Sequence, residues 1–344
     1  MAFKSVSQPV NVPKRTVRAA AIQLEATLGN VAENLQRIER LVDEAAREGA
    51  KLIAVPEFFT TRIAFDSKVH EAVLPADNNQ ALTLLKDLAR RHQCSLGGSF
   101  LVADGEQVRN RYHFVEPDGG VHIHDKDLPT MWENAFYGPA DAGDNGAFST
   151  ALGGVGVAVC WELIRSQTAR RLLGRVDVVV TGTHWWSLPD NWGSVISRAL
   201  APLGQFNRYL SENAPVEFAR RMGTPVLQAS HCGHFRTNFQ LAPGFGASVP
   251  YETECVGATQ IVSADGRVLA CRQAQEGPGV VVADIALGRQ DPKHSLDNRF
   301  WIPELPAFLK AYWHQQNACG KAYYRQKGRQ AGLDAATLNL EMKQ

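Results

Sequence analysis

The sequence lacks long hydrophobic runs, a marked charge imbalance and paired cysteine motifs. No stretch of about 18 uninterrupted apolar residues occurs among its 344 residues, so it offers no candidate membrane span. Lys and Arg number 36 against 35 Asp and Glu, and a net charge of +1 gives no long-range field to attract nucleic acid or an acidic membrane surface. We therefore expect neither partner, and a small molecule as the ligand.

Secretory and disulfide signals are also missing. The first fifteen residues are polar and lack the apolar stretch of a secretory signal, which favours a cytoplasmic location. The cysteines never occur as C-x-x-C, and we expect free thiols rather than a disulfide framework or a zinc site. Their positions are Cys94, Cys160, Cys232, Cys255, Cys271 and Cys319.

Neither a low-complexity linker nor a fixed-period repeat divides the chain. We predict an N-terminal arm over residues 1–15, one α/β domain over 16–290 and a C-terminal extension over 291–344. The extension is rich in aromatic and basic residues, and we expect it to pack on the domain or, as we prefer, at a subunit interface.

Apolar strands alternate with helical patterns along the domain, which predicts a mixed sheet. The main expected helices span residues 30–49, 81–92, 164–173 and 195–222. The main expected strands span residues 17–22, 52–55, 95–102, 112–115, 121–124, 155–159, 176–181, 225–230, 257–263, 268–271 and 280–285.

Cys160 stands where an apolar strand meets a predicted helix. Such a corner faces the crevice in which open α/β sheets bind ligands, and a helix N-terminus lowers the pKa of a thiol. A free cysteine more often simply packs in a core, so position alone leaves both interpretations open.

Two further residues end strands in a similar way. Glu57 follows Ala54-Val55-Pro56, where a partly desolvated carboxylate could act as a base near neutral pH. Lys126 follows the strand over residues 121–124. Individually, either residue could instead be a cap or a solvated charge.

In the order Glu57, Lys126, Cys160, these segments resemble the nitrilase superfamily of carbon–nitrogen hydrolases, from Val17 to Ile285. Cys160-Trp161-Glu162 looks like the motif of the nitrile-hydrolysing branch, and the segment from Pro129 places the family's second glutamate on Glu133. The resemblance implies an α/β fold, a four-layer α-β-β-α sandwich with mixed sheets. It also implies a homodimer or a larger homo-oligomer.

The same resemblance implies roles for these residues. Glu57 would deprotonate Cys160, the thiolate would attack carbon, and Lys126 with the N–H of Trp161 would stabilise the developing charge. Glu133 would hold Lys126 or position the substrate, and no metal or organic cofactor is required. Trp185 and Trp186 would form an aromatic wall beside the substrate, or would simply be core residues.

Other motifs give weaker signals. Gly153-Gly154-Val155-Gly156 precedes a strand and so does not match a nucleotide loop. His122 with His124, and His231 with His234, lack a third ligand at a suitable spacing, and we expect ordinary strand and loop histidines. Arg165 is the one evident candidate for binding a substrate carboxylate.

The expected reaction is hydrolysis of a small nitrile or primary amide through a thioimidate or thioester, releasing ammonia and a carboxylic acid. Cleavage of an N-carbamoyl compound or a substituted amide is the alternative, followed by acyl transfer to an amine. A non-catalytic scaffold of the same fold would be expected to lose at least one of Glu57, Lys126 and Cys160, and all three are present.

Overall fold

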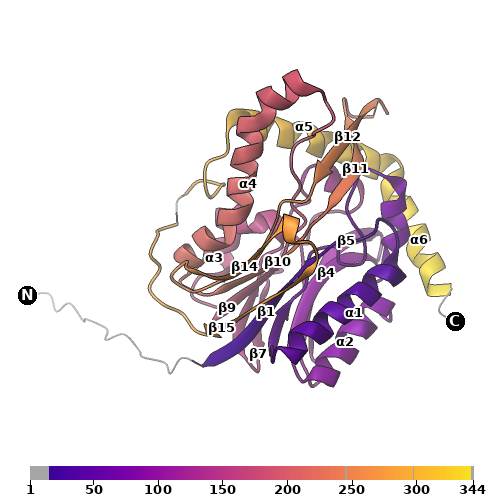
Figure 1. The fold of residues 1–344 in the computed structure, drawn as a ribbon. Helices are drawn as coiled ribbons and strands as arrows, with labels where there is room; N and C mark the ends of the chain where they lie inside the picture. The colour runs from indigo at the N-terminus through magenta and orange to yellow at the C-terminus, as the bar shows by residue number, and fades with distance from the viewer. Residues whose placement is uncertain (1–14, 245, 297, 342–344) are drawn as a thin grey trace, which may run out of the picture.

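The computed structural model describes residues 15–244, 246–296 and 298–341 (Figure 1). The expected N-terminal arm, residues 1–15, lies outside this part except for Arg15. Among the described residues, no helix is both long enough and apolar enough to cross a membrane.

The first of two mixed sheets has the strand order β6-β5-β4-β2-β1, with β15 antiparallel to β1 and β3 beside β4. Strands β1, β2 and β4 are parallel, and β5 and β6 continue the sheet antiparallel. The bounds are β1 (Thr16–Leu24), β2 (Leu52–Ala54), β3 (Leu74–Pro75), β4 (Ser95–Asp104), β5 (Gln107–Val115), β6 (Val121–Asp125) and β15 (Gly279–Ala286).

The second sheet has the order β10-β9-β8-β7, with β13 antiparallel to β10 and β14 antiparallel to β13. It meets the first sheet through a short parallel pairing of Gln23 with Ser230 and Leu24 with His231. The bounds are β7 (Ala147–Thr150), β8 (Gly153–Val157), β9 (Val178–Gly182), β10 (Val226–His231), β13 (Gly257–Val262) and β14 (Val268–Gln273). A separate hairpin that the sequence analysis did not predict joins β11 (His234–Gln240) to β12 (Ser248–Glu254).

Helices cover the outer face of each sheet. Helices α1 and α2 lie on the first sheet, and α3 and α4 lie on the second (Figure 1). Side chains of β1 alternate accordingly: Ala20 and Ile22 pack with α1 and α2, whereas Ala19 and Ala21 belong to the core shared with the second sheet. The chain is therefore a four-layer α-β-β-α sandwich. The bounds are α1 (Val31–Arg47), α2 (Gln80–His92), α3 (Ser166–Leu172) and α4 (Ser194–Met222).

The helix predicted over residues 164–173 is divided in two. A 3₁₀ turn, η3 (Cys160–Ile164), precedes α3, and the chain is extended between them at Arg165, with φ −110° and ψ 127°. Arg165 forms an antiparallel bridge with Trp301, and Ile302 donates its N–H to the carbonyl of Ile164 at 2.7 Å. Pairing with this C-terminal segment therefore replaces the first helical turn.

The C-terminal extension packs on its own domain. Its helix α5 (Ala307–Tyr323) contacts the 3₁₀ turn η2 (Met131–Ala135), where the Asn317 Oδ1 accepts the N–H of Met131 at 2.8 Å. The remaining short elements are η1 (Ser67–Ala72), η4 (Ala274–Glu276), the π-helical turn η5 (Tyr324–Gly328) and α6 (Arg329–Glu341).

Candidate active site

Glu57 follows β2 in the first sheet and is fully buried. Its Oε1 accepts hydrogen bonds from Asn110 Nδ2 at 2.8 Å and Lys126 Nζ at 2.9 Å, and its Oε2 accepts the N–H of His184 at 3.0 Å. The next residue, Phe58, has a φ of +51°, a backbone conformation that non-glycine residues rarely adopt. Strand end and turn together direct the carboxylate inward.

Lys126 follows β6, and its ammonium bridges two buried carboxylates. Nζ donates to Glu57 at 2.9 Å and to Glu133 Oε2 at 2.7 Å. That same Glu133 oxygen accepts the N–H of Thr130 at 2.9 Å and the hydroxyl of Tyr137. Contacts with neighbours in its own segment therefore hold Glu133 in place, and Glu133 holds the ammonium of Lys126.

Cys160 begins η3 directly after the second sheet's strand β8 and has a φ of +54°. Its Sγ and one oxygen each of Glu57 and Glu133 all lie within 4.8 Å of one another. A thiolate with two carboxylates could in principle hold a metal ion, but the Lys126 ammonium already binds both carboxylates. The structure therefore brings together all four residues that the sequence singled out for chemistry.

Burial dominates the ionisation of this group. Burial raises the pKa of the Glu57 carboxyl to about 7, against the opposing charge of Lys126. Burial alone would lower the pKa of Lys126, but Glu133 and Glu57 raise it well above its usual value. The expected lowering of the Cys160 pKa by a helix N-terminus is wrong, because burial and the nearby Glu57 raise it well above its usual value and η3 is only a five-residue turn. The thiol thus needs a base.

An aromatic wall adjoins the site. Trp161, Trp185 and Trp186 are buried and line a small cavity of about 10 Å³, to which α5 contributes Leu309 and Tyr312. A void of that size holds about one water molecule, so the tryptophans and α5 pack closely against one another here. The side chain of Trp186 also stacks on Trp132, with ring centroids 4.2 Å apart.

Comparison with known proteins identifies the family of this chain. Residues 18–292 match the family model described as carbon-nitrogen hydrolase. The chain belongs to the carbon–nitrogen hydrolase family. A citrullinase from Francisella tularensis is 27% identical over 219 residues, 57% of this chain and 75% of that protein. A bifunctional nitrilase/nitrile hydratase from Nicotiana tabacum is 25% identical over 310 residues, 83% of this chain and 82% of that protein.

Solved structures show the same fold. A carbon-nitrogen hydrolase from Helicobacter pylori gives a TM-score of 0.65 at 18% identity, covering 79% of this chain and 89% of that one. An amidase from Nesterenkonia sp. AN1, with the acetamide moiety of fluoroacetamide added to its active-site cysteine, gives a TM-score of 0.57 at 21% identity. That match covers 86% of this chain and 96% of the amidase. These structures show the fold, while the family model and the sequence relatives show the nitrilase superfamily of carbon–nitrogen hydrolases.

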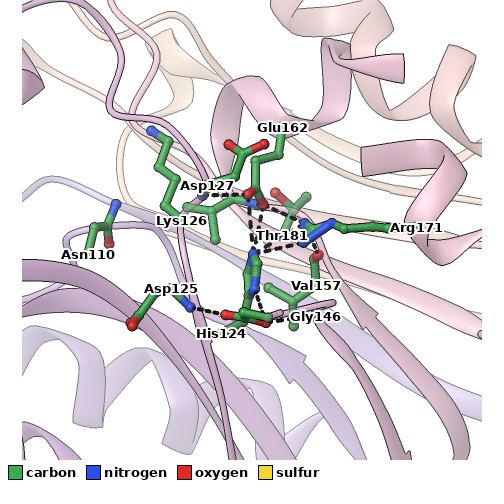
Figure 2. A network of polar contacts seen from close by, with 12 residues as sticks. Asn110, His124, Asp125, Lys126, Asp127, Gly146, Val157, Glu162, Arg171 and Thr181 are labelled. Carbon is green, nitrogen blue, oxygen red and sulfur yellow. Dashed lines mark hydrogen bonds and ion pairs between the residues drawn. The ribbon is translucent and has the colours of Figure 1, made fainter. Parts of the chain in front are cut away.

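Two residues of this carbon–nitrogen hydrolase differ from expectation. His124 is not an ordinary strand histidine, because it lies buried in a charged cluster with Glu162 and Arg171 (Figure 2). Arg165 is not free to bind a substrate carboxylate, because it is fully buried and its guanidinium is ion-paired with Asp127. Loop and sheet contacts across the chain, which no local pattern reveals, determine both environments.

Two groups that were not predicted from the sequence contact the carboxylate of Glu57. Asn110 lies within β5, and the backbone N–H of His184 follows β9. Asn110 lies between Arg109 and Arg111, before the strand predicted over residues 112–115, so the local pattern does not mark it as buried. A backbone N–H carries no signal in the sequence.

Proposed function

We propose that this carbon–nitrogen hydrolase cleaves small nitriles or primary amides to carboxylic acids, with Cys160 as the nucleophile. One observation carries the proposal. The ammonium of Lys126 is held between the carboxylates of Glu57 and Glu133, and the Cys160 thiol lies beside both carboxylates. Base, nucleophile and cation thus share one buried site.

With an amide, the Cys160 proton passes to Glu57 as sulfur bonds to the carbonyl carbon. Negative charge develops on oxygen, where Lys126 and the N–H of Trp161 stabilise it. Collapse of this intermediate breaks the C–N bond, Glu57 returns its proton to the leaving nitrogen, and ammonia departs from a thioester. Water then gives a proton to Glu57 and its oxygen to the acyl carbon, which releases the acid and restores the thiol.

A nitrile reaches the same thioester after the addition of one extra water molecule. Addition of the thiol across the C≡N bond gives a thioimidate, and one water adds to the thioimidate carbon. Loss of ammonia from that adduct gives the thioester, so two waters are consumed for each acid released. The same base and cation serve both substrates.

The pocket favours an uncharged acyl group. Trp161, Trp185 and Trp186 present apolar surface at the site, and Arg165 is occupied by Asp127. The similarity to a citrullinase supports a second candidate, cleavage of N-carbamoyl compounds or substituted amides. We also propose residues 16–290 as the catalytic domain and residues 291–344 as an extension that completes its pocket.

A substrate panel tests these proposals. Small nitriles, primary amides and N-carbamoyl compounds are assayed for ammonia release, with hydroxylamine added in parallel to detect acyl transfer. We expect ammonia and acid from nitriles or primary amides. Release from carbamoyl compounds alone would favour the second candidate, and inertness toward every class would support a non-catalytic scaffold.

A further inference from the structure

The Glu162 carboxylate, two residues after the nucleophile, has no part in the chemistry proposed above. It is fully buried, and its Oε1 accepts the backbone N–H of Asp127 at 2.9 Å. Its Oε2 accepts the backbone N–H of Val159 at 2.7 Å and a guanidinium N–H of Arg171 at 3.0 Å. The imidazole Nε2 of His124 lies 3.0 Å from Oε2.

The two backbone contacts of Glu162 join separate parts of the site. Asp127 is the neighbour of Lys126 in the loop after β6, and Val159 is the neighbour of Cys160 in the turn after β8. One carboxylate therefore spans the segments that carry the cation and the nucleophile. Figure 2 shows the Lys126 side chain directed away from this cluster, while the backbone at Asp127 reaches Glu162.

His124 keeps the carboxylate in place. Its Nδ1 lies 2.9 Å from a carboxylate oxygen of Asp144 and its Nε2 lies 3.0 Å from Glu162, and two carboxylates at these distances favour the imidazolium form. The cluster then contains two cations, His124 and Arg171, against the carboxylates Glu162 and Asp144. Such a buried group of charges is costly to break on one side only.

We propose that Glu162, held by His124 and Arg171, is a positioning residue that fixes the Lys126 loop against the Cys160 turn. Glu162 acts by holding the segments that carry Lys126 and Cys160, and it does not touch the reacting atoms. This inference rests on the proposed function for its kinetic consequence. Its structural consequence, protection of the backbone amides of Asp127 and Val159, is independent of any substrate.

Glu162→Gln is the direct variant. Glutamine keeps one acceptor oxygen, but its NH₂ group replaces the other oxygen and cannot accept a hydrogen bond. Because the backbone N–H groups of Asp127 and Val159 donate to different oxygens of Glu162, at least one of these two contacts is lost. A displacement of about 1 Å at a catalytic group costs about 100-fold in rate, and we expect kcat to fall by about that factor with little change in KM.

Alkylation of Cys160 by iodoacetamide distinguishes a displaced Lys126 loop from general disruption of the Cys160 site. Displacement of iodide puts no charge on a carbonyl oxygen, so it does not need Lys126. We expect the alkylation rate in Glu162→Gln to stay within about fivefold of the original while kcat falls far more. The exposed Cys271 serves as the internal reference in peptide mass spectrometry.

His122→Asn is the matched control. His122 lies two residues before His124 on the same strand and has a comparable contact, 2.8 Å from its Nε2 to Glu116, but it does not contact Glu162. We expect its kcat to stay within about twofold of the original protein, because His122 is partly exposed and its partner Glu116 lies in neither the Lys126 loop nor the Cys160 turn.

The pH profile tests the histidine separately. Burial alone would lower the pKa of His124, but Glu162 from η3 and Asp144 from the loop before β7 raise it to about 9, against the charge of Arg171 from α3. Asp127 lies on the far side of Glu162. The imidazolium is lost as the pH rises through about 9, so kcat should decline there, and His124→Asn should have a low kcat without that decline.

Hydrogen–deuterium exchange on the full chain decides the outcome independently of turnover. We expect faster exchange in the peptides that contain Asp127 and Val159 in Glu162→Gln and in His124→Asn, but not in His122→Asn. Unchanged exchange in both peptides, or an unchanged kcat in a folded Glu162→Gln protein, would overturn the proposal. Inertness of the unmodified protein toward every substrate would instead contradict the proposed function, while exchange would still decide the positioning role.

Discussion

At the scale of single residues, burial favours the protonated form of both the proposed nucleophile and the proposed base. The raised pKa of Cys160 keeps sulfur protonated at neutral pH, and Glu57 has a pKa of about 7. In the proposed mechanism, reaction therefore begins with transfer of the Cys160 proton to Glu57, not with a preformed thiolate. This arrangement protects the sulfur from unwanted electrophiles, because thiolates, not thiols, react.

The Glu57 carboxyl must be unprotonated to accept the thiol proton. Its pKa is raised by burial, so the active fraction grows as the pH rises through about 7. We predict that kcat/KM for an uncharged substrate rises on an acid limb centred near pH 7. A limb near the ordinary pKa of an exposed glutamate would contradict this assignment.

Cys160→Ala should remove turnover and leave the fold intact. Loss of the only nucleophile should cost at least about 10³-fold in kcat, while the missing sulfur leaves only a small cavity. Cys94→Ala is the control, because Cys94 is equally buried but lies beneath α2, away from the site. Steady-state kinetics and thermal melts of both variants check the prediction, and a Cys160→Ala protein with more than a few per cent activity would refute it.

At the scale of elements, the hydrophobic pattern was sufficient to predict most strands and helices. It placed Glu57 and Cys160 after apolar runs that mark buried strands, and it placed Lys126 after a short strand in which apolar and polar residues alternate. It did not predict that the helix is interrupted at Arg165, because this residue pairs with Trp301, which lies 136 positions away along the chain. Nor did it find Asn110, whose role depends on the register of β5 against its neighbours.

Helix α5 should determine how large an acyl group the site accepts. Leu309 from this helix is buried against the tryptophan wall, whereas the adjacent Phe308 is 58% exposed. Leu309→Ala enlarges the pocket, and we predict about a tenfold shift of kcat/KM toward longer acyl chains, the usual effect of one or two methylenes in an apolar pocket. Phe308→Ala should leave the chain-length profile unchanged, and an equal shift in both variants would argue against α5 as a pocket wall.

At the scale of the whole molecule, the site exists because two sheets meet. Glu57 and Lys126 come from the first sheet, and Cys160 from the second. Gly182 at the end of β9 allows the close approach, because a Cβ there would lie 2.2 Å from the backbone nitrogen of Glu57. A side chain at this position would push the base away from the nucleophile.

Gly182→Ala is therefore predicted to reduce both stability and activity. Overpacking of this kind lowers the free energy of unfolding by about 1–3 kcal/mol or more, and the displaced Glu57 should lower kcat as well. Gly204→Ala is the control: no neighbouring atom lies within 4 Å of its added Cβ, and alanine favours the helix by up to about 1 kcal/mol. Denaturant unfolding and kinetics distinguish the two, and an active, stable Gly182→Ala protein would contradict the argument.

The first half of α4 gives the last prediction, a dimer. Its residues 194–206 include no buried side chain, although Val195 and Ile196 are apolar and 75% and 47% exposed. A helix that extends beyond its domain gains stability from packing, and a second copy of the chain would supply that packing. Light scattering at micromolar concentration should give at least twice the chain mass of 37.7 kDa. Ile196→Glu should reduce that mass, whereas Leu338→Glu on α6, apolar and 59% exposed before substitution, should not. A single-chain mass for the unmodified protein would refute the dimer.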